Sequence, residues 1–226
     1  MGNLATTLAF ATEESALLAE LRAGSEDAFN WLITHYHQPI YSLLARSLRD
    51  CDAAADLTQE VFIKVFRGIR SFHGESSLRT WIYRIALREA SNQRRWWARH
   101  RQQEISLDQQ MGEAECGYKL RDSLVDPEVS PLDVMMQAEV RNRVEAALGR
   151  VPEPFRTTVL LREVEGFGYE EIAAVLGVNL GTIKSRLVRG RALLKTELMA
   201  PVASMPMEPD SGGECLYPAP AYEEAQ

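Results

Sequence analysis

The chain has 226 residues, of which 46% are hydrophobic and 25% charged, a globular composition long enough for one large or two small domains. No run reaches the roughly 18 apolar residues of a membrane-spanning helix, and residues 1–10 lack the features of a secretory signal, so a cytoplasmic protein is expected. The net charge of −7 argues against a nucleic-acid partner, but the charges are unevenly spread. Residues 79–101 hold seven arginines and one acid, and residues 182–195 hold five basic residues and no acid. Two such segments create local positive potentials that favour nucleic acid.

Hydrophobic residues recur with helical spacing, and the alternation typical of strands is nearly absent. Helices are therefore expected over residues 13–23 and 25–38. Pro39 lacks the N–H that a helix interior needs, so a break is expected there, followed by a new helix that ends near residue 50. Helices over 53–69 and 77–99 complete a first domain, residues 1–100.

Residues 101–130 lose this periodicity, and their glutamine pairs, glycines and acids indicate a flexible linker. Ser130 and Pro131 are typical of a helix start, which predicts a helix to about residue 148. A helix over 154–165 would be closed by Gly166 in the left-handed conformation. The second domain is expected over 131–198, and residues 199–226 as a disordered acidic tail. The predicted fold is all-α, with two small helical domains.

The segment Tyr169–Arg191 has the pattern of a helix-turn-helix. Ala173 is the small residue where the two helices can touch, Gly177 can turn the chain, and Asn179 can cap the second helix. An inward stripe of that second helix is predicted at Ile183, Leu187 and Leu194.

The other faces of this second helix are polar and basic. Ser185, Val188 and Arg189 point outward, where side chains can reach base edges in the major groove. Thr182 and Lys184 lie at the edge of that face. Arg186, Arg191 and Lys195 lie on its flanks and would mostly hold phosphates. An amphipathic surface helix with a solvated basic face is the alternative interpretation.

The helix over 53–69 has two faces. Its core stripe is expected to consist of Leu57, Val61, Phe62, Val65, Phe66 and Ile69. Its second stripe mixes charged and amide groups with an isoleucine, at Asp56, Gln59, Glu60, Ile63 and Arg67. Such a mixture is common on protein-binding faces, and also on plain surfaces.

The helix over 77–99 carries basic and amide residues at spacings of three and four, which aligns them on one face: Arg84, Arg88, Asn92, Arg95 and Arg99. Trp81, Tyr83, Trp96 and Trp97 are interleaved with them. Basic groups attract a nucleic-acid backbone, and aromatic rings can stack on unpaired bases. This pattern favours single-stranded or locally melted DNA, although Trp81 also suits a core position.

Several stretches, in one order, resemble sigma factors of the extracytoplasmic-function (ECF) type in the sigma-70 family. Residues 56–62 (DLTQEVF) and 78–86 (LRTWIYRIA) resemble sigma region 2. Residues 151–156 (VPEPFR), 169–173 (YEEIA) and 181–186 (GTIKSR) resemble region 4. The resemblance covers about residues 13–100 and 131–198.

The resemblance implies a transcription initiation factor with no enzymatic activity, cofactor or metal. Core RNA polymerase would be bound at its β′ clamp through Asp56, Gln59, Glu60 and Ile63, and at its β flap through region 4. The loop over 72–81 and the following helix would recognise and help melt the −10 element, with a base flipped out of the stack; the residues are Trp81, Arg84, Arg88, Asn92 and Arg95. The −35 element would be recognised by Thr182, Lys184, Ser185, Arg186, Val188, Arg189 and Arg191. An anti-sigma factor is a further expected partner.

Three alternatives stay open at this point. A plain helix-turn-helix regulator would explain residues 169–191 but leave the 56–66 face and the basic helix without a role. An enzyme with a metal site is disfavoured, because its candidate ligands His35 and His37, two residues apart on a helix, point away from each other. A sigma-like protein that binds regulators without initiating transcription is the third.

Overall fold

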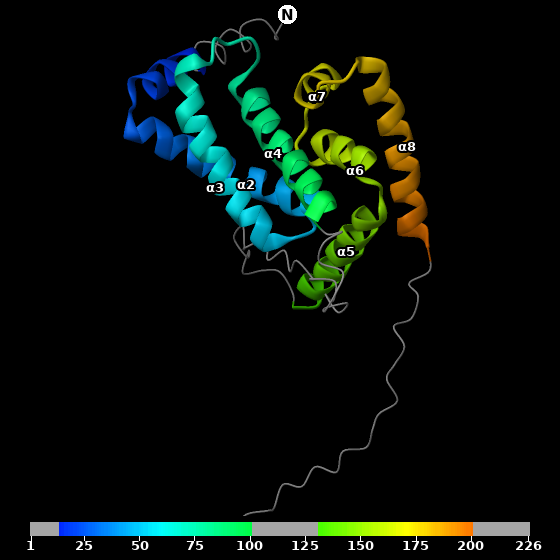
Figure 1. The fold of residues 1–226 in the computed structure, drawn as a ribbon. Coiled ribbons are helices and arrows are strands. Elements are labelled where there is room, and N and C mark those ends of the chain that lie inside the picture. Colours follow the sequence, from blue (N-terminus) through cyan, green and yellow to red (C-terminus); the bar gives the residue numbers. More distant parts are fainter. Residues whose placement is uncertain (1–13, 101–130, 201–226) are drawn as a thin grey trace, which may run out of the picture.

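The computed structural model describes residues 14–100 and 131–200, and every regular element within these ranges is helical (Figure 1). After a helical segment at residues 14–23, the first unit contains α2 (Glu26–Leu48), α3 (Cys51–Gly68), the 3-10 turn η1 (Ile69–Ser71) and α4 (Leu78–His100). The second contains α5 (Pro131–Arg150), α6 (Glu153–Val159), the π-helical turn η2 (Leu160–Val164), α7 (Tyr169–Leu176) and α8 (Leu180–Met199). The predicted all-α fold of two helical units is confirmed for these residues. The expected linker over 101–130, and the tail beyond residue 200, lie outside the described residues.

The predicted break at Pro39 is wrong, because α2 runs through this proline without interruption. A proline inside a helix costs about 3 kcal/mol, since it removes one backbone hydrogen bond and crowds the preceding turn. Leu32 on one side of it, and Ile40 and Leu44 on the other, are completely buried. Each such side chain contributes roughly 1.5–3 kcal/mol, so burying one continuous stripe outweighs the loss at the proline.

The core of the first unit lies between α2, α3 and α4. From α3 it takes Ala54, Thr58, Val61 and Val65; the buried Thr58 hydroxyl donates to the Ala54 carbonyl at 2.6 Å. The expectation that Phe66 belongs to this core is wrong, because 60% of its surface is exposed. The α3 stripe is narrower than the sequence pattern suggests, and Phe66 lies outside it, with its ring 4.7 Å from that of Phe29.

In the second unit, the helix expected over 154–165 is α-helical only at first and continues as the π turn η2. Gly166 then takes the left-handed conformation, as predicted, with φ of 71°. Gly177 does the same at the helix-turn-helix corner, with φ of 66°. Asn179 caps α8 by accepting a hydrogen bond from the Thr182 backbone N–H at 2.8 Å, so the predicted cap is confirmed.

Helix α8 crosses α6 at very close range, and Gly190 makes this possible. A Cβ added at Gly190 would lie 2.7 Å from Cγ2 of Val159 and 3.2 Å from the carbonyl oxygen of Phe155. Ile183 and Leu187 of α8 are buried on the same side. The crossing fixes which face of α8 remains free.

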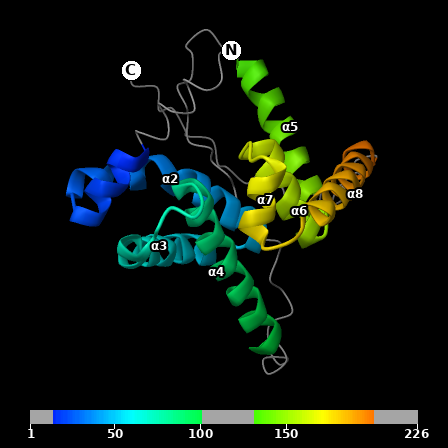
Figure 2. The ribbon, with the colours of Figure 1, turned by 90° about the horizontal axis from the view of Figure 1, so that it is seen from above.

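The two units are in direct contact and share one hydrophobic core cluster. Helix α4 lies against α7, and the end of α2 against α5 and α6 (Figures 1 and 2). At this junction Arg156, only 6% exposed, donates to the Gly149 and Val151 carbonyls at the end of α5, at 3.3 and 3.2 Å. It also donates to the Ser47 carbonyl in the last turn of α2 at 3.1 Å. One guanidinium thus satisfies carbonyls at the C-terminal ends of helices from both units. Within the described residues, no helix is long and apolar enough to cross a membrane.

Candidate nucleic-acid and protein interfaces

The outward face of α8 is open. Lys184, Ser185, Val188 and Arg189 are exposed, and Val188 shows 68% of its surface. The backbone N–H groups of the first turn lie beside this face, and such groups bind phosphate readily. An exposed helix with Arg, Ser and an apolar side chain on one face can reach base edges in a major groove.

Three of the predicted contact residues on α8 have structural partners. Ser185 donates its hydroxyl to the Thr182 carbonyl at 2.9 Å. Thr182 donates its hydroxyl to the capping side chain of Asn179 at 2.9 Å. Arg191 makes a two-pronged ion pair with Glu163 of η2, at 2.9 and 2.6 Å. Hydrogen bonds to that carboxylate raise the pKa of Arg191 above its usual range. To hold a phosphate, Arg191 must share or exchange this partner.

The basic face of α4 is directed toward the second unit. Arg84, Arg88 and Arg95 line one cavity of about 570 Å³ together with the end of α7. Arg84 donates from Nε to the Ala174 carbonyl of α7 at 3.1 Å. Arg95 donates to the side-chain oxygen of Asn92 at 2.5 Å. The predicted alignment of the arginines along one face is therefore present, and part of that face is covered.

The aromatic residues of α4 are in different places. Trp81 is half-buried, its ring centre 4.9 Å from that of Phe72, and it lies close against Gly68. Tyr83 is buried in the core. Trp96 is half-exposed and stacks on His100. Trp97 lies on the opposite side of α4, against α3. Trp81 therefore supports the loop before α4 rather than presenting a free stacking face.

The predicted protein-binding face of α3 borders an acidic groove of about 480 Å³. Of the predicted residues, Asp56 and Glu60 line it; Gln59 and Ile63 are exposed nearby. Lys64 pairs with Glu60 at 3.3 Å and with Glu89 of α4 at 2.7 Å. The hydrogen bond to Glu89 is the main cause that raises the pKa of Lys64. The groove as a whole would attract a cationic partner surface.

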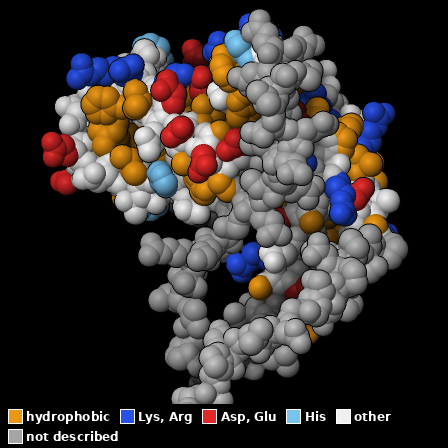
Figure 3. All heavy atoms as spheres, turned by 60° about the horizontal axis from the view of Figure 1, so that its bottom comes forward, with side chains coloured by type: hydrophobic (Ala, Val, Ile, Leu, Met, Phe, Trp, Pro, Cys, Tyr) orange, Lys and Arg blue, Asp and Glu red, His pale blue; other side chains and the backbone are white. Residues whose placement is uncertain are grey.

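The sequence interpretation missed several residues of this face. Asp50, Asp52, Gln93 and Trp97 also line the groove. An apolar strip lies beside it, made of the exposed Ile33, Ile63 and Phe66 and the partly buried Phe29 and Phe62. In Figure 3, acidic and apolar side chains lie side by side on the part of the surface formed by α2 and α3. Helical spacing alone could have placed Trp97 away from Arg95 and Arg99, since successive residues point 100° apart.

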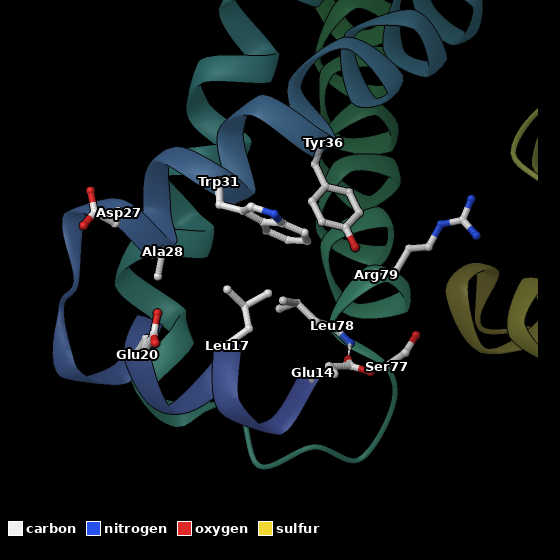
Figure 4. Close-up of a pocket in the computed structure, with 10 residues that line it drawn as sticks. All are labelled: Glu14, Leu17, Glu20, Asp27, Ala28, Trp31, Tyr36, Ser77, Leu78 and Arg79. Carbon is white, nitrogen blue, oxygen red and sulfur yellow. Dashed lines mark hydrogen bonds between the residues drawn. The ribbon is translucent and has the colours of Figure 1, made fainter. Parts of the chain in front are cut away.

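A second cavity, of about 630 Å³, lies between residues 14–23, α2 and the start of α4. Figure 4 shows the indole of Trp31 and the side chains of Leu17 and Leu78 facing it. Glu20 and Asp27 lie at its rim, and the Glu14 carboxylate accepts the backbone N–H of Leu78. Flat apolar walls with carboxylates at the edge suit a planar group that bears an amino group. The cavity adjoins the predicted −10 loop, which contributes Ser77, Leu78 and Arg79 to its wall.

The two histidines considered as metal ligands have separate neighbours. His35 stacks on Trp31 and bonds to the Trp31 carbonyl. His37 lies beside the ring of Phe62. Each imidazole therefore packs against an aromatic neighbour, His35 on α2 and His37 against α3.

Comparison with known proteins gives a consistent result. Residues 32–101 match the family model "Sigma-70 region 2", and residues 141–194 match "Sigma-70, region 4". The ECF RNA polymerase sigma-E factor of Haemophilus influenzae is 35% identical over 82% of this chain and 95% of its own length. The RNA polymerase sigma-H factor of Pseudomonas aeruginosa is also 35% identical, over 82% of this chain and 94% of its own. Neither family model describes an enzyme.

Solved structures share the fold at lower identity. The sigma factor RpoE of Bartonella quintana, solved with the anti-sigma factor NepR, has a TM-score of 0.58 at 24% identity and covers 76% of this chain and 97% of that one. CnrH, solved with the cytosolic domain of CnrY, has a TM-score of 0.55 at 21% identity, over 82% and 96%. Both matches extend over the two helical units together.

Proposed function

The chain belongs to the sigma-70 family, as an ECF sigma factor, and from this we propose which of its surfaces carry out transcription initiation. A sigma factor binds core RNA polymerase and directs it to promoters. The question for this chain is which residues bind polymerase and which bind each promoter element.

We assign core polymerase binding to α3 and the groove beside it. Asp56, Gln59, Glu60 and Ile63 would dock on the clamp helices of the β′ subunit. The acidic groove supplies charge complementarity, and the strip with Phe66 supplies the apolar centre that protein interfaces need. Trp97 extends this surface onto α4.

We assign the −10 element to α4 and the loop before it. Arg84, Arg88, Asn92 and Arg95 would hold the strand, and Trp81 would act by supporting the loop. Extruding one base from the stack costs a few kcal/mol and requires a receiving pocket. The cavity beside Trp31 is the pocket we propose, since Arg79 borders it and its carboxylates can accept hydrogen bonds from an amino group of adenine or cytosine.

We assign the −35 element to α8. Ser185, Val188 and Arg189 would contact base edges, with Thr182 and Lys184 beside them. Arg186 and Arg191 would hold phosphates and fix the register. Region 4 would also contact the β flap. The observation that carries this assignment is the exposed outer face of a capped helix-turn-helix, with Lys184, Ser185, Val188 and Arg189.

A regulatory partner and a cellular location are also proposed from the family. An anti-sigma factor is a proposed regulator, because the sigma factor RpoE, which shares the fold, was solved with the anti-sigma factor NepR. Core RNA polymerase works in the cytoplasm, so we propose the same location for this chain. No catalytic role is proposed for it.

The test is promoter-specific run-off transcription with core RNA polymerase and a fragmented genomic library of the host. Discrete transcripts that require the chain are the expected result, and their start sites would give the promoter motif. Polymerase binding without transcripts would overturn the initiation function and favour a protein that only binds regulators. Duplex binding without polymerase binding would favour a plain regulator.

A further inference from the structure

Residues 72–77 are the non-helical part of the predicted −10 loop, with buried ends and an exposed tip. Phe72, its first residue, and Leu78, which follows it, are both buried, whereas residues 73–75 are exposed. Gly74 at the tip has a left-handed φ of 78°, and beyond its adjacent residues no atom lies within 4 Å of the position where a Cβ would be. The tip can therefore meet a nucleic-acid strand, and its course depends on how the two ends of the loop are held.

The first end of the loop is held by Arg22, in the helical segment over residues 14–23. The Arg22 guanidinium donates to the backbone carbonyl of Phe72, 50 positions later in the chain. The Phe72 ring packs on that of Trp81, with the ring centres 4.9 Å apart. Both the carbonyl and the side chain of Phe72 are thus fixed.

The second end is held by Glu14, from the same helical segment. Its carboxylate accepts a hydrogen bond from the Leu78 backbone N–H, and Figure 4 shows this bond at the edge of the cavity. This N–H belongs to the first turn of α4, where backbone N–H groups lack partners within the helix and attract negative charge. The Ser77 hydroxyl oxygen accepts the Thr80 N–H of the same turn at 3.1 Å. Glu14 therefore completes a cap that Ser77 alone would leave unfinished.

The helical segment that carries both residues is itself anchored. Glu14, Leu18 and Arg22 follow one another at spacings of four, which places them along one side of the helix. Leu18 packs against the core, and Leu21 is buried in it. The segment ends where the Gly24 N–H donates to the Leu21 carbonyl at 3.2 Å and Gly24 takes a left-handed φ of 84°. One packed helix thus sets the positions of both ends of the loop.

We propose that Glu14 and Arg22 are positioning residues for −10 recognition, which hold the loop in the shape that distinguishes one base sequence from another. The inference rests on the role proposed above for this loop and α4. Both residues precede residues 32–101, the part of the chain that matches the region 2 model. Neither side chain needs to touch DNA for this role, because each acts through the backbone group that it holds.

Loss of either contact should affect discrimination between sequences more than the strength of binding. The arginines of α4 attract phosphates whatever the shape of the loop, and phosphate contacts carry no sequence information. A loop with one end released adopts more conformations, and fixing one of them on each binding event costs conformational entropy. That cost opposes only the complexes in which the loop contacts a base.

The experiment uses variants that remove each contact and variants that keep part of it. Glu14→Ala removes the acceptor, whereas Glu14→Gln keeps a neutral oxygen that can accept the same N–H. Arg22→Met removes the donors but keeps an unbranched side chain, whereas Arg22→Lys keeps the charge and a donor. Glu14→Ala and Arg22→Met change the net charge in opposite directions, so an effect that they share does not come from charge. Glu26→Ala is the matched control, because Glu26 is an exposed carboxylate in the first turn of the neighbouring α2.

Base discrimination is measured with the holoenzyme, formed from each variant and core RNA polymerase. Fluorescence anisotropy gives its affinity for a labelled single strand with the −10 sequence found by run-off transcription, and for a scrambled strand. Glu14→Ala and Arg22→Met are expected to lower the ratio of the two affinities by about three- to tenfold. Glu14→Gln and Arg22→Lys should stay closer to the wild-type ratio, and Glu26→Ala should keep it.

Two measurements on the free chain examine the loop itself. Hydrogen–deuterium exchange over residues 72–78 should be faster in Glu14→Ala and Arg22→Met than in the wild-type chain, because one end of the loop is released. Circular dichroism establishes that each variant is folded and gives its Tm.

Unchanged affinity ratios in Glu14→Ala and Arg22→Met would overturn the proposal. An equal fall in affinity for both strands, accompanied by a lower Tm, would overturn it too, since it would show a role in stability alone. The same loss of discrimination in Glu26→Ala would also count against it, by attributing the effect to any lost carboxylate nearby.

The wild-type holoenzyme separates this proposal from the proposed function. If it prefers the −10 strand and the variants do so equally, the positioning roles are wrong and the sigma-factor function stands. If it supports no run-off transcription, the proposed function itself fails, and the positioning roles fail with it.

Discussion

The close approach of α6 and α8 gives a sharp test of how the DNA-binding helix is positioned. The change is Gly190→Ala, the addition of one methyl group on the buried side of α8. In an unconstrained helix interior this replacement stabilises by about 1 kcal/mol, because alanine loses less conformational freedom than glycine on folding. At Gly190 the new Cβ would lie 2.7 Å from Cγ2 of Val159 and 3.2 Å from a backbone oxygen.

Neither of these neighbours can move freely. Val159 has a branched side chain with one preferred rotamer in a helix, and the oxygen belongs to the backbone of α6. Overpacking of this kind costs about 1–3 kcal/mol, so we expect a net loss of about 1 kcal/mol. Gly181→Ala, near the start of the same helix, is the control: its Cβ would meet only the Asn179 side chain at 3.4 Å. That variant should gain up to about 0.5 kcal/mol.

The assay is thermal unfolding of the full chain, followed by circular dichroism. Since 1 kcal/mol shifts Tm by about 2–4 °C in a domain of this size, Gly190→Ala should melt several degrees below Gly181→Ala. It should also bind −35 duplex more weakly, although no side chain on the outer face of α8 has changed. If Gly190→Ala were as stable as the wild-type chain, α8 would have room to shift, and the close crossing would not fix its outer face.

Three further outcomes are expected. Arg189→Ala should relax base preference in the −35 element at a cost of roughly 1–3 kcal/mol. Arg191→Ala should instead weaken binding to all sequences and lower the salt dependence of the binding constant by about one unit of slope. Equal loss of sequence preference in both variants, measured by fluorescence anisotropy on a set of duplexes, would contradict the assigned roles. Phe66→Ala should weaken binding to core polymerase by about 1–2 kcal/mol in a pull-down titration. Its Tm should change little, because the side chain is mostly exposed; a large fall in Tm would show that Phe66 belongs to the core. Trp31→Ala should slow promoter opening, monitored by permanganate footprinting, and leave −35 binding unchanged; normal opening would exclude the cavity beside Trp31 as the base pocket.

Local chemistry made much of the fold predictable. The Asn179 cap and the left-handed Gly166 and Gly177 depend on residue type at one position, and the structure has all three. Helix limits followed from hydrophobic spacing, and α3, α4 and α5 begin and end within two residues of the predicted positions. The prediction of a break at Pro39 was wrong, because the rule that proline interrupts helices does not take account of the side chains buried on both sides of it.

The surfaces were harder to predict, since they depend on which helices meet. Arg84 was correctly aligned with the other arginines of α4, but its bond to the Ala174 carbonyl joins the two units through residues that are 90 positions apart in sequence. Glu14 gave no signal in its own segment, and its importance arises only from the Leu78 N–H opposite. Phe66 had the spacing of a core residue and lies outside because α2 and α4 cover a narrower part of α3.

The buried guanidinium of Arg156 implies that dissolved salt cannot fully separate the two units. Screening weakens exposed ion pairs strongly, and the pair of Arg94 in α4 with Glu153 in α6 is accessible enough to respond. The bond from Arg156 to the Ser47 carbonyl is hidden from ions, and breaking it leaves a carbonyl at the end of α2 without its donor. Raising the ionic strength should therefore weaken the contacts between the two units only up to a limit. Complete separation of the units requires a molecule that binds them when they are apart. The Gly149 and Val151 carbonyls that the same arginine also binds belong to its own unit, so the end of α5 is expected to stay capped when the units separate.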